Sequence, residues 1–263
     1  MSMRFIPATE HDQNLAVAFD GQAAAFENAP VQSDPVALAH FVSLLGLPRE
    51  SEILDAGCGP GLVAEALLVA GYRVVGIDLS REMIERATLR CARFGDRCRF
   101  TQRSVFDSAI DHRFDGVVSR YVIHHLAHPR GFVARLEGLL RPGGVMLVCD
   151  HTTDPAHERA EWHQRVERAR DRTHTRNLTP GELVDLIASA GLQSIAFAEE
   201  PFTLDFDEWF DRGTPALSKH ETLALIRSGP GARGFTISGR ESCTIHCVRG
   251  LVRGIKPVEN QPQ

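Results

Sequence analysis

Residues 53–67 read ILDAGCGPGLVAEAL: a short apolar run, three closely spaced glycines and then an amphipathic stretch. The run at 51–57 predicts a strand, and residues 61–71 predict a helix that ends at Gly71. Gly57, Gly59 and Gly61 permit positive φ angles in the turn between them and let a ligand approach the backbone. The free N–H groups at the start of the following helix favour an anion. The segment therefore predicts a ligand-binding turn between a strand and a helix.

The alternation of strand and helix continues along the chain. Helices are predicted at 81–95 and 129–143, a helix followed by a strand at 179–200, and strands at 72–80, 97–104, 113–121, 143–151 and 233–252. Strands that alternate with helices of this length build parallel βαβ units. We predict an α/β fold with a doubly wound, mostly parallel sheet of seven strands.

The flanking segments are predicted to be mainly helical. We expect a helical N-terminal cap over 1–50, a ligand-binding core over 51–150, and a lid helix with the completion of the sheet over 151–263, all in a single domain. Ser33 or Asp34 can cap a helix in the first part. The lid helix is the amphipathic stretch 155–173.

Composition narrows the classes of protein. The 263 residues are 43% hydrophobic and 24% charged, with a net charge of −5, which excludes disordered and fibrous classes and gives no sign of a nucleic-acid partner. No run approaches the roughly 18 apolar residues of a membrane helix, and the first residues lack a signal-peptide pattern, so we expect a cytoplasmic protein without membrane insertion. The six cysteines show no CxxC spacing and predict free thiols without a metal site. Nothing in the sequence predicts the oligomeric state.

Histidine is distributed unevenly. Eight of the twelve histidines lie between His112 and His174. Histidines that were only solvated surface residues would be scattered, so this crowding predicts a functional site in the middle of the chain. His128, His157 and His163 lie in polar or helical stretches and are expected at the surface.

The predicted strand after the first helix ends in an acid. Asp78 follows Gly57 by 21 residues, and at the tip of a second strand a carboxylate can accept hydrogen bonds from both hydroxyls of a ribose. The glycine spacing is GxGxG, whereas a dinucleotide site has GxGxxG with room for a pyrophosphate. The pattern therefore favours a nucleoside ligand other than a dinucleotide.

Three segments carry a family resemblance: LDAGCGPG at 54–61, VVGIDLS at 74–80 and LRPGGVMLV at 140–148. Together they resemble the class I S-adenosylmethionine (SAM)-dependent methyltransferases, which have a Rossmann-like fold. The resemblance implies that SAM is the cofactor. It places the methionine end of SAM at the loop Asp55, Ala56, Gly57, Cys58 and Gly59, the ribose at Asp78, and the adenine near Leu79 and Met83.

The adenine contact departs from the family pattern. Where the family often has a Gly-Asp pair after the third strand, this chain has Arg103 and Ser104, followed by Val105. Either the Ser104 hydroxyl makes that contact or Asp107 reaches back to make it.

The segment FDGVVSRYVIHHLAHP, residues 114–129, resembles a subgroup that includes ubiquinone and menaquinone C-methyltransferases. The resemblance places Arg120 at the methionine end of SAM, and the alternative is a salt bridge to Glu27 or another nearby acid. His124 and His125 are neighbours and cannot face the same way. We expect His124 in the pocket and His125 packed and hydrogen-bonded near Asp55.

Methyl transfer from a sulfonium needs alignment and exclusion of water, and it needs a base only if the acceptor loses a proton. A neutral imidazole suits that role, so His124 and His174 are the predicted catalytic residues. The predicted acceptor-binding residues are Phe19, Phe26, Tyr121, His125 and His151.

The leading hypothesis is methylation of a small aromatic, quinone-like or natural-product acceptor at carbon, oxygen or nitrogen. One alternative is an RNA methyltransferase, which the arginine-rich face of 159–172 favours and the acidic net charge opposes. Another is a SAM-binding protein that does not transfer the methyl group, because the glycine loop and Asp78 account only for binding.

Overall fold

The computed structural model describes residues 10–107 and 109–258. Within these residues eight strands form one sheet, with seven in the order β3-β2-β1-β4-β5-β8-β6 and β7 paired to β8. The strands are β1 (Glu52–Ala56), β2 (Arg73–Asp78), β3 (Cys98–Gln102), β4 (Phe114–Arg120), β5 (Leu140–His151), β6 (Gln193–Asp205), β7 (Phe235–Ser238) and β8 (Thr244–Ile255). Strands β1 to β5 are parallel and β8 is antiparallel to its neighbours, which confirms the predicted mostly parallel α/β sheet.

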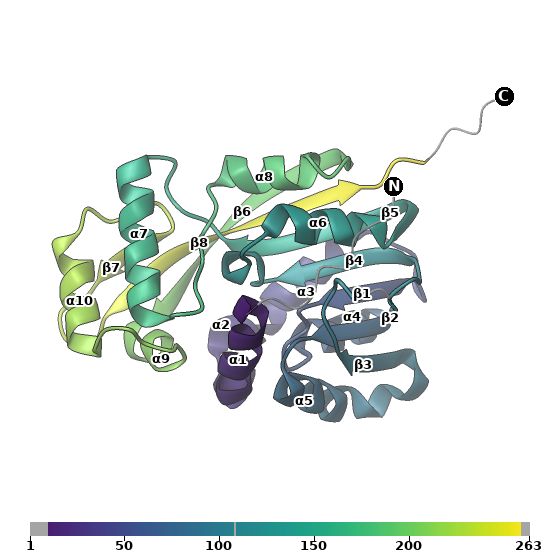
Figure 1. Cartoon of the computed structure of the whole chain (residues 1–263), viewed down its shortest axis with the longest axis horizontal. Helices are drawn as coiled ribbons and strands as arrows, with labels where there is room; N and C mark the ends of the chain where they lie inside the picture. Colours follow the sequence, from purple (N-terminus) through teal and green to yellow (C-terminus); the bar gives the residue numbers. More distant parts are fainter. Residues whose placement is uncertain (1–9, 108, 259–263) are drawn as a thin grey trace.

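Helices precede, connect and follow these strands (Figure 1). They are α1 (Glu10–Asn28), α2 (Pro30–Ser33), α3 (Pro35–Ser43), α4 (Leu62–Ala70), α5 (Arg81–Cys91), α6 (Pro129–Gly138), α7 (His157–Arg170), α8 (Pro180–Ala188), α9 (Phe206–Asp211) and α10 (Lys219–Ser228), with short 3₁₀ turns η1 (Ala92–Arg97) and η2 (Ile123–His125). None of the helices within the described ranges is long and apolar enough to cross a bilayer.

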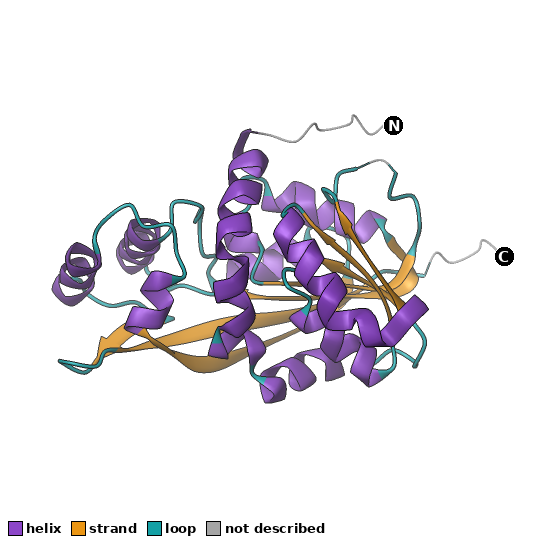
Figure 2. Cartoon of the chain, turned by 90° about the horizontal axis from the view of Figure 1, so that it is seen from below, coloured by secondary structure: helices purple, strands orange, loops and turns teal. Residues whose placement is uncertain are grey.

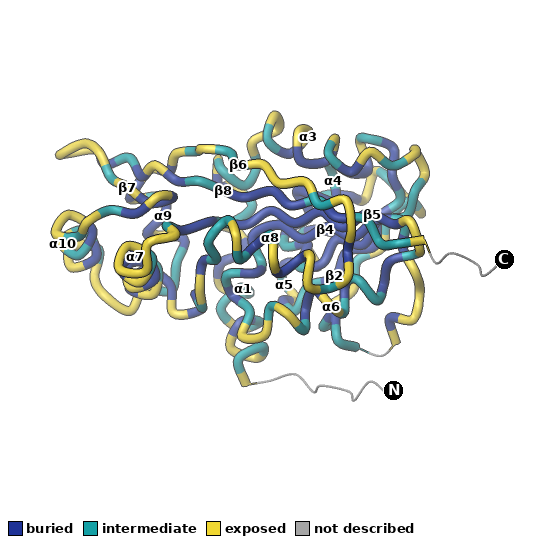
Figure 3. Tube along the Cα trace, turned by 90° about the horizontal axis from the view of Figure 1, so that it is seen from above, coloured by how far each residue is buried: buried dark blue, intermediate teal, exposed yellow. Residues whose placement is uncertain are grey.

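Two apolar cores lie on opposite faces of the parallel part of the sheet. One face packs against α6 and α8, through Phe132, Leu136 and Ile187, and the other packs against α3 and α4, through Phe41 and Leu67. Figure 2 shows helices on both sides of the strands at this end of the sheet. Figure 3 shows that the buried positions run along the central strands, while the edge strand β6 is largely exposed. Because both faces are covered, the strands here are apolar on both sides.

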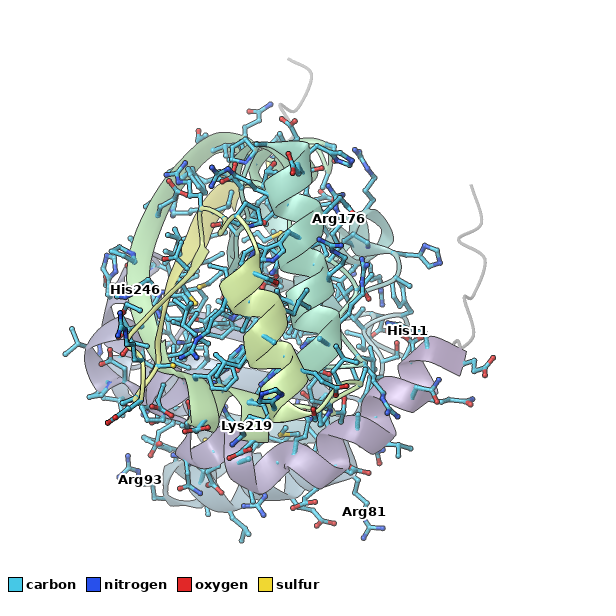
Figure 4. All side chains as sticks on the ribbon, turned by 90° about the vertical axis from the view of Figure 1, so that its left-hand side faces the viewer. His11, Arg81, Arg93, Arg176, Lys219 and His246 are labelled. Carbon is cyan, nitrogen blue, oxygen red and sulfur yellow. The ribbon has the colours of Figure 1, made fainter. Side chains whose placement is uncertain are left out.

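A third core lies beyond the parallel part of the sheet, where β6 and β8 extend and β7 joins them. Trp162 of α7, Trp209 of α9, Ile226 of α10 and Phe235 of β7 are buried against one another there. Figure 4 looks onto this end and shows α7 and α10 side by side in front of the strands, with Lys219 at the start of α10. We call this part of the molecule, residues 157–177 and 202–249, the distal lobe.

The C-terminal strand prediction was wrong in one detail. Residues 233–252 form a hairpin of β7 and β8, not a single strand, because the chain turns at Gly239 with a φ of +86°. A Cβ at that position would lie 2.1 Å from the carbonyl oxygen of Ser242, so the turn requires glycine.

In the N-terminal part, Asp34 is the residue that caps α3, accepting a hydrogen bond of 2.9 Å from the N–H of Val36.

The order of the strands creates a crevice. The chain begins the sheet at β1, adds β2 and β3 on one side, and then adds β4 and β5 on the other. Connections leave β1 and β4 toward opposite faces at this reversal, and open α/β sheets bind ligands at the carboxyl ends of strands at such a point. The ends of β1, β2 and β4 therefore define the region in which the functional site is expected.

Replacing Gly61 with Ala should destabilise the fold. Gly61 has a φ of +83°, and a Cβ there would lie 2.9 Å from the Cα of Ala87 in α5. The left-handed conformation alone costs a residue with a Cβ about 1–2 kcal/mol, and the contact with α5 adds to that cost. We expect urea denaturation to show a lower free energy of unfolding for Gly61→Ala. Gly138→Ala is the matched control, because no atom lies within 4 Å of its Cβ position. Equal stability of the two variants would contradict the prediction.

Candidate functional site

A cavity of about 1120 Å³, including its open mouth, lies at the carboxyl ends of β1, β2 and β4. We call it the strand-end cavity. Most of the residues predicted from the sequence to bind the cofactor or the acceptor line it, from five separate parts of the chain: Phe19, Phe26, Asp55, Gly57, Cys58, Gly59, Asp78, Leu79, Met83, Ser104, Val105, Arg120, Tyr121 and His125. Ala56 does not line it, because its side chain is fully buried in the core.

Asp55 is a buried acid with an unused hydrogen-bond acceptor. It is 1% exposed, and its Oδ2 has no hydrogen-bond partner among the described residues. Burial, together with the negative charge of Asp78, raises the pKa of Asp55 to about 7. A buried carboxylate without a partner is unfavourable, and a bound ammonium group would relieve it. The Asp55 end of the strand-end cavity therefore suits a cationic group.

The glycine loop brings the backbone close to Asp78. Gly57 and Gly59 have φ angles of +75° and +52°. The Asp78 carboxylate accepts hydrogen bonds of 2.9 Å from the N–H groups of Gly59 and Ser80. Burial raises the pKa of Asp78, against the lowering effect of these hydrogen bonds. A carboxylate has about four lone-pair sites, so Asp78 can hold the loop and still accept hydrogen bonds from a ligand.

The opposite end of the strand-end cavity is mostly apolar, with Leu79, Met83, Phe106 and Phe132 in its lining. Ser104 lies in this lining, and its hydroxyl accepts a hydrogen bond of 3.2 Å from the N–H of Phe106. Asp107 is not part of the lining and forms an ion pair of 3.3 Å with Arg103. Of the two alternatives left open by the sequence, only Ser104 faces the cavity.

Arg120 ends β4 and lines the strand-end cavity. Its guanidinium donates hydrogen bonds to the carbonyl oxygens of Gln32 (3.2 Å) and Val31 (3.1 Å), and lies 4.4 Å from the centre of the Tyr121 ring. The alternative salt bridge to Glu27 was wrong. The face of α1 that carries Glu27 is turned toward α5, where Glu27 pairs with Arg86 at 2.6 Å and Arg90 at 2.8 Å.

The prediction for the two adjacent histidines was correct in part. His124 lines a cavity, and His125 is buried with its ring 3.2 Å from the carbonyl oxygen of Thr173 and edge-on against Phe19. No contact of His125 with Asp55 is found among the described residues. The expectation that the two rings face different ways was wrong: both occur in a 3₁₀ turn, their ring centres lie 4.0 Å apart, and both line the same cavity, while only His125 also lines the strand-end cavity.

His124 lines a second cavity of about 540 Å³, including its mouth, together with His125, His151 and His174. We call it the histidine cavity. It adjoins the strand-end cavity, because Phe26, Gln32, Tyr121 and His125 line both. Two separate compartments with a shared wall could hold two ligands next to each other.

His124 is paired with Asp150 at the end of β5. The His124 Nδ1 lies 2.5 Å from Oδ1 of Asp150, and the His124 N–H donates to the other carboxylate oxygen at 3.2 Å. Burial opposes a charged imidazole, but the charge and hydrogen bond of Asp150 outweigh it and raise the pKa of His124. With a proton on Nδ1 held by the carboxylate, Nε2 is the nitrogen left to accept a proton.

The other histidines of this cavity are poor proton acceptors. Burial, together with the charge of His124, lowers the pKa of His125 and of His151 to about 3. Burial also lowers the pKa of His174, despite the nearby charge of Glu167, and Gln164 Oε1 lies 2.9 Å from its ring. The structure therefore brings together four of the crowded histidines, of which only His124 is suited to accept a proton at neutral pH.

Three histidines were expected at the surface. His128 and His157 are exposed, as predicted. His163 is only 1% exposed, so that prediction was wrong. Its ring lies 2.9 Å from the Thr153 hydroxyl and 3.4 Å from a Glu167 oxygen, because it occurs on the face of α7 that packs against Phe235 of β7.

Several residues of the histidine cavity were not predicted. Glu167, Arg170, Asp171 and Arg212 line it from the end of α7 and the segment after α9. Gln32 of α2 lies on the wall that both cavities share. The amphipathic pattern of 155–173 indicated that one face of this helix is buried, but not that its last turn carries charged groups into a cavity.

Comparisons with known proteins agree with this geometry. Residues 32–196 match a family model described as a methyltransferase domain. The chain is 33% identical to a ubiquinone biosynthesis O-methyltransferase of Cereibacter sphaeroides over 149 residues, which cover 54% of this chain and 60% of the relative. A protein of the same name from Xanthomonas axonopodis pv. citri is 28% identical and is covered to 76%. The chain thus spans about 60% of the length of the first of these relatives.

Solved structures show the same fold. The YcgJ protein of Bacillus subtilis superposes with a TM-score of 0.74 at 23% identity, over 84% of this chain and 97% of that one. The geranyl diphosphate C-methyltransferase of Streptomyces coelicolor, solved with S-adenosylhomocysteine, superposes with a TM-score of 0.61 at 17% identity, over 95% and 99% of the two chains. At these identities the likeness establishes the architecture.

Proposed function

Because the chain belongs to the methyltransferase domain family, we propose that it transfers a methyl group from SAM to a small-molecule acceptor and releases S-adenosylhomocysteine. The sequence resembles SAM-dependent methyltransferases and so predicts SAM as the cofactor. The family match confirms both the resemblance and the class of cofactor. The observation that carries the proposal for this chain is the pair of adjoining cavities, with His124 in the lining of the second one and Asp150 paired with it.

The residues of the strand-end cavity fit the methyl donor. The partnerless Oδ2 of Asp55 would accept hydrogen bonds from the ammonium of the methionine moiety. Asp78 would accept from the ribose hydroxyls, and Leu79, Met83 and Ser104 would bound the adenine. SAM supplies an electrophilic methyl group on a positively charged sulfur. The protein's part is to hold this donor, exclude water and align it with the acceptor.

The histidine cavity would hold the acceptor. Its contact with the strand-end cavity through Phe26, Tyr121 and His125 would place an acceptor atom beside the methyl donor. His124 Nε2 would take the proton of an acceptor hydroxyl or amine, and Asp150 would stabilise the resulting imidazolium. Methylation of a neutral hydroxyl, of a neutral amine or of an aromatic carbon releases one proton, so the His124–Asp150 pair supports an acceptor that loses a proton in the reaction.

The two alternatives, an RNA methyltransferase and a SAM-binding protein without methyl transfer, require different features of the site. An RNA acceptor must place a base at the methyl donor, but the buried lining of the histidine cavity, with Arg170, Asp171 and His174 each at most 8% exposed, leaves little room for a polynucleotide. A SAM-binding protein without methyl transfer would not need a paired base next to the donor. Both observations support a small acceptor.

The test is SAM turnover with fractionated cell extract. The purified chain is incubated with SAM and either a low-molecular-weight filtrate or total RNA, and S-adenosylhomocysteine is quantified. We expect product that depends on the filtrate. Product only with RNA would favour the RNA alternative, and SAM binding without product in either fraction would favour the non-catalytic one.

The rate of methyl transfer should depend on pH through His124. The base must be unprotonated, so kcat should fall as the pH drops through the pKa of His124, which lies above its usual value of 6.5. In Asp150→Asn the main raising influence is gone and only the weaker charges of Glu167 and Asp171 remain against burial, so the acid limb of the pH profile should move to lower pH as kcat falls. An acid limb at the same pH in both proteins would contradict the assignment.

A further inference from the structure

Two arginines that were not predicted as site residues line the histidine cavity. Arg170 ends α7 and Arg212 follows α9, and they are 8% and 6% exposed. Burial lowers the pKa of Arg212 to about 10, and the positive charge of Arg170 adds to this lowering. Two guanidinium groups are therefore close to each other and shielded from bulk water. Burying two like charges is unfavourable unless opposite charges compensate them and their N–H donors are hydrogen-bonded.

The surrounding protein fixes Arg170 in place. Its Nε donates to the carbonyl oxygen of Trp209 at 2.8 Å, its Nη1 donates to Asp171 at 3.2 Å, and its guanidinium lies 5.2 Å from the centre of the Trp209 ring. Gly213 packs directly against it, because a Cβ there would lie 2.7 Å from the Arg170 Nε. The glycine thus allows the chain to pass close behind the guanidinium.

Arg212 is held from one side only. Its Nε lies 2.6 Å from a Glu208 oxygen, and its guanidinium lies 5.9 Å from the centre of the Phe26 ring, on the wall shared by the two cavities. Within the described part of the chain, no hydrogen-bond partner is found for Nη2 of Arg170 or Nη1 of Arg212. Each guanidinium has five N–H donors, so both retain donors for a ligand.

The nearby acids compensate part of the arginine charge. Asp171 pairs with Nη1 of Arg170 and also accepts hydrogen bonds from Thr173 and Thr214. Glu208 pairs with Arg212 through Nε and Nη2. Glu167 contacts His163, and its charge acts on Arg170 and Arg212 as well as on the histidines. None of these contacts uses Nη2 of Arg170 or Nη1 of Arg212, so these two groups can still donate to a ligand.

We propose that the acceptor carries an anionic group, a carboxylate or a phosphate, which binds between Arg170 and Arg212 while its methyl-accepting hydroxyl or amine faces His124. Guanidinium groups bind carboxylates and phosphates in bidentate geometry, which fixes orientation as well as position. Trp209 and Phe26 also line this cavity, so part of its lining is aromatic and suits an apolar segment between the two ends of such an acceptor. This inference rests on the proposed function, since it specifies the acceptor of the same reaction.

The experiment measures binding of matched acid and amide pairs to the protein saturated with S-adenosylhomocysteine, by calorimetry. The acids are 4-hydroxybenzoate, 3,4-dihydroxybenzoate and 4-hydroxyphenylacetate, each compared with its primary amide, and 4-hydroxyphenyl phosphate tests a phosphate as the anion. We expect at least one anion to bind about tenfold or more tightly than its neutral counterpart, as the loss of charged hydrogen bonds implies. Preference for the phosphate or the carboxylate identifies the anion.

The variants Arg170→Gln and Arg212→Gln should each remove this preference. Arg165→Gln is the matched control, because Arg165 lies on the exposed face of the same helix. Thermal unfolding and S-adenosylhomocysteine affinity show whether each variant is folded. If no anion is preferred in the unaltered protein, including the case in which none of the compounds binds, or if the preference survives in both variants, the inference is overturned. Failure to bind S-adenosylhomocysteine would instead contradict the proposed function.

Discussion

Replacing His124 with Gln is expected to lower kcat by about 10²- to 10⁴-fold, the usual contribution of a positioned general base. Glutamine fills much of the same space but cannot accept the proton that an acceptor hydroxyl or amine must lose. The affinity for S-adenosylhomocysteine should stay unchanged, since His124 does not line the strand-end cavity. The measurement is the rate of S-adenosylhomocysteine formation at saturating SAM and acceptor.

The control for His124 is His128→Gln, four residues along the chain and exposed to solvent, which should retain full activity. If His124→Gln kept kcat within about threefold of the unaltered protein, the acceptor would not depend on this base for its proton. In that case Asp150 would serve only to fix the histidine in the wall of the cavity.

Replacing Asp78 with Ala is the second change with a large expected effect. Loss of two charge-assisted hydrogen bonds to the ribose should weaken SAM binding by about 2–3 kcal/mol, or roughly 30- to 150-fold in Kd. The variant also releases the N–H groups of Gly59 and Ser80, so the glycine loop loses the acceptor that holds it against β2. Titration calorimetry with SAM and with S-adenosylhomocysteine measures the effect.

Asp185→Ala is the matched control for Asp78, because Asp185 lies exposed on α8 and is not part of either cavity. It should bind SAM as the unaltered protein does. If the Asp78→Ala variant is folded and binds SAM with unchanged Kd, then Asp78 does not bind the ribose, and the proposed placement of the cofactor at the tip of β2 is wrong.

The sheet was predictable because its signals are local. Strand β1 is a short apolar run followed by Gly57, β2 ends at Asp78, α4 is closed by Gly71 and α5 is capped by Ser80. The hairpin at Gly239 is not predicted, because GRES separates two short runs that alternate in the same way and together resemble one strand. The turn becomes visible only in the pairing of β7 with β8.

The site was predictable in part. The residues proposed to bind the methyl donor follow from the glycine loop and Asp78, since their spacing along the chain fixes their place at the strand ends. That His124 and His125 share one cavity is not predicted, because neighbours in a strand or an α-helix point in different directions, whereas these two occur in a 3₁₀ turn. Arg170 and Arg212 lie 42 positions apart in the sequence and meet only because α7 and α9 pack on the same core. Such tertiary neighbours leave no signal in a single sequence.

The distal lobe has its own apolar core and is tied into the sheet through the two long strands β6 and β8. It supplies Glu167, Arg170, His174 and Arg212 to the histidine cavity but none of the loop that surrounds Asp55 and Asp78. Under the proposed function, the acceptor site draws part of its lining from a lobe that contributes nothing to the glycine loop. We expect substitutions in the distal lobe to change which acceptor binds while they leave the residues around Asp55 and Asp78 unaltered, which makes this lobe the place to begin redesigning the enzyme for new acceptors.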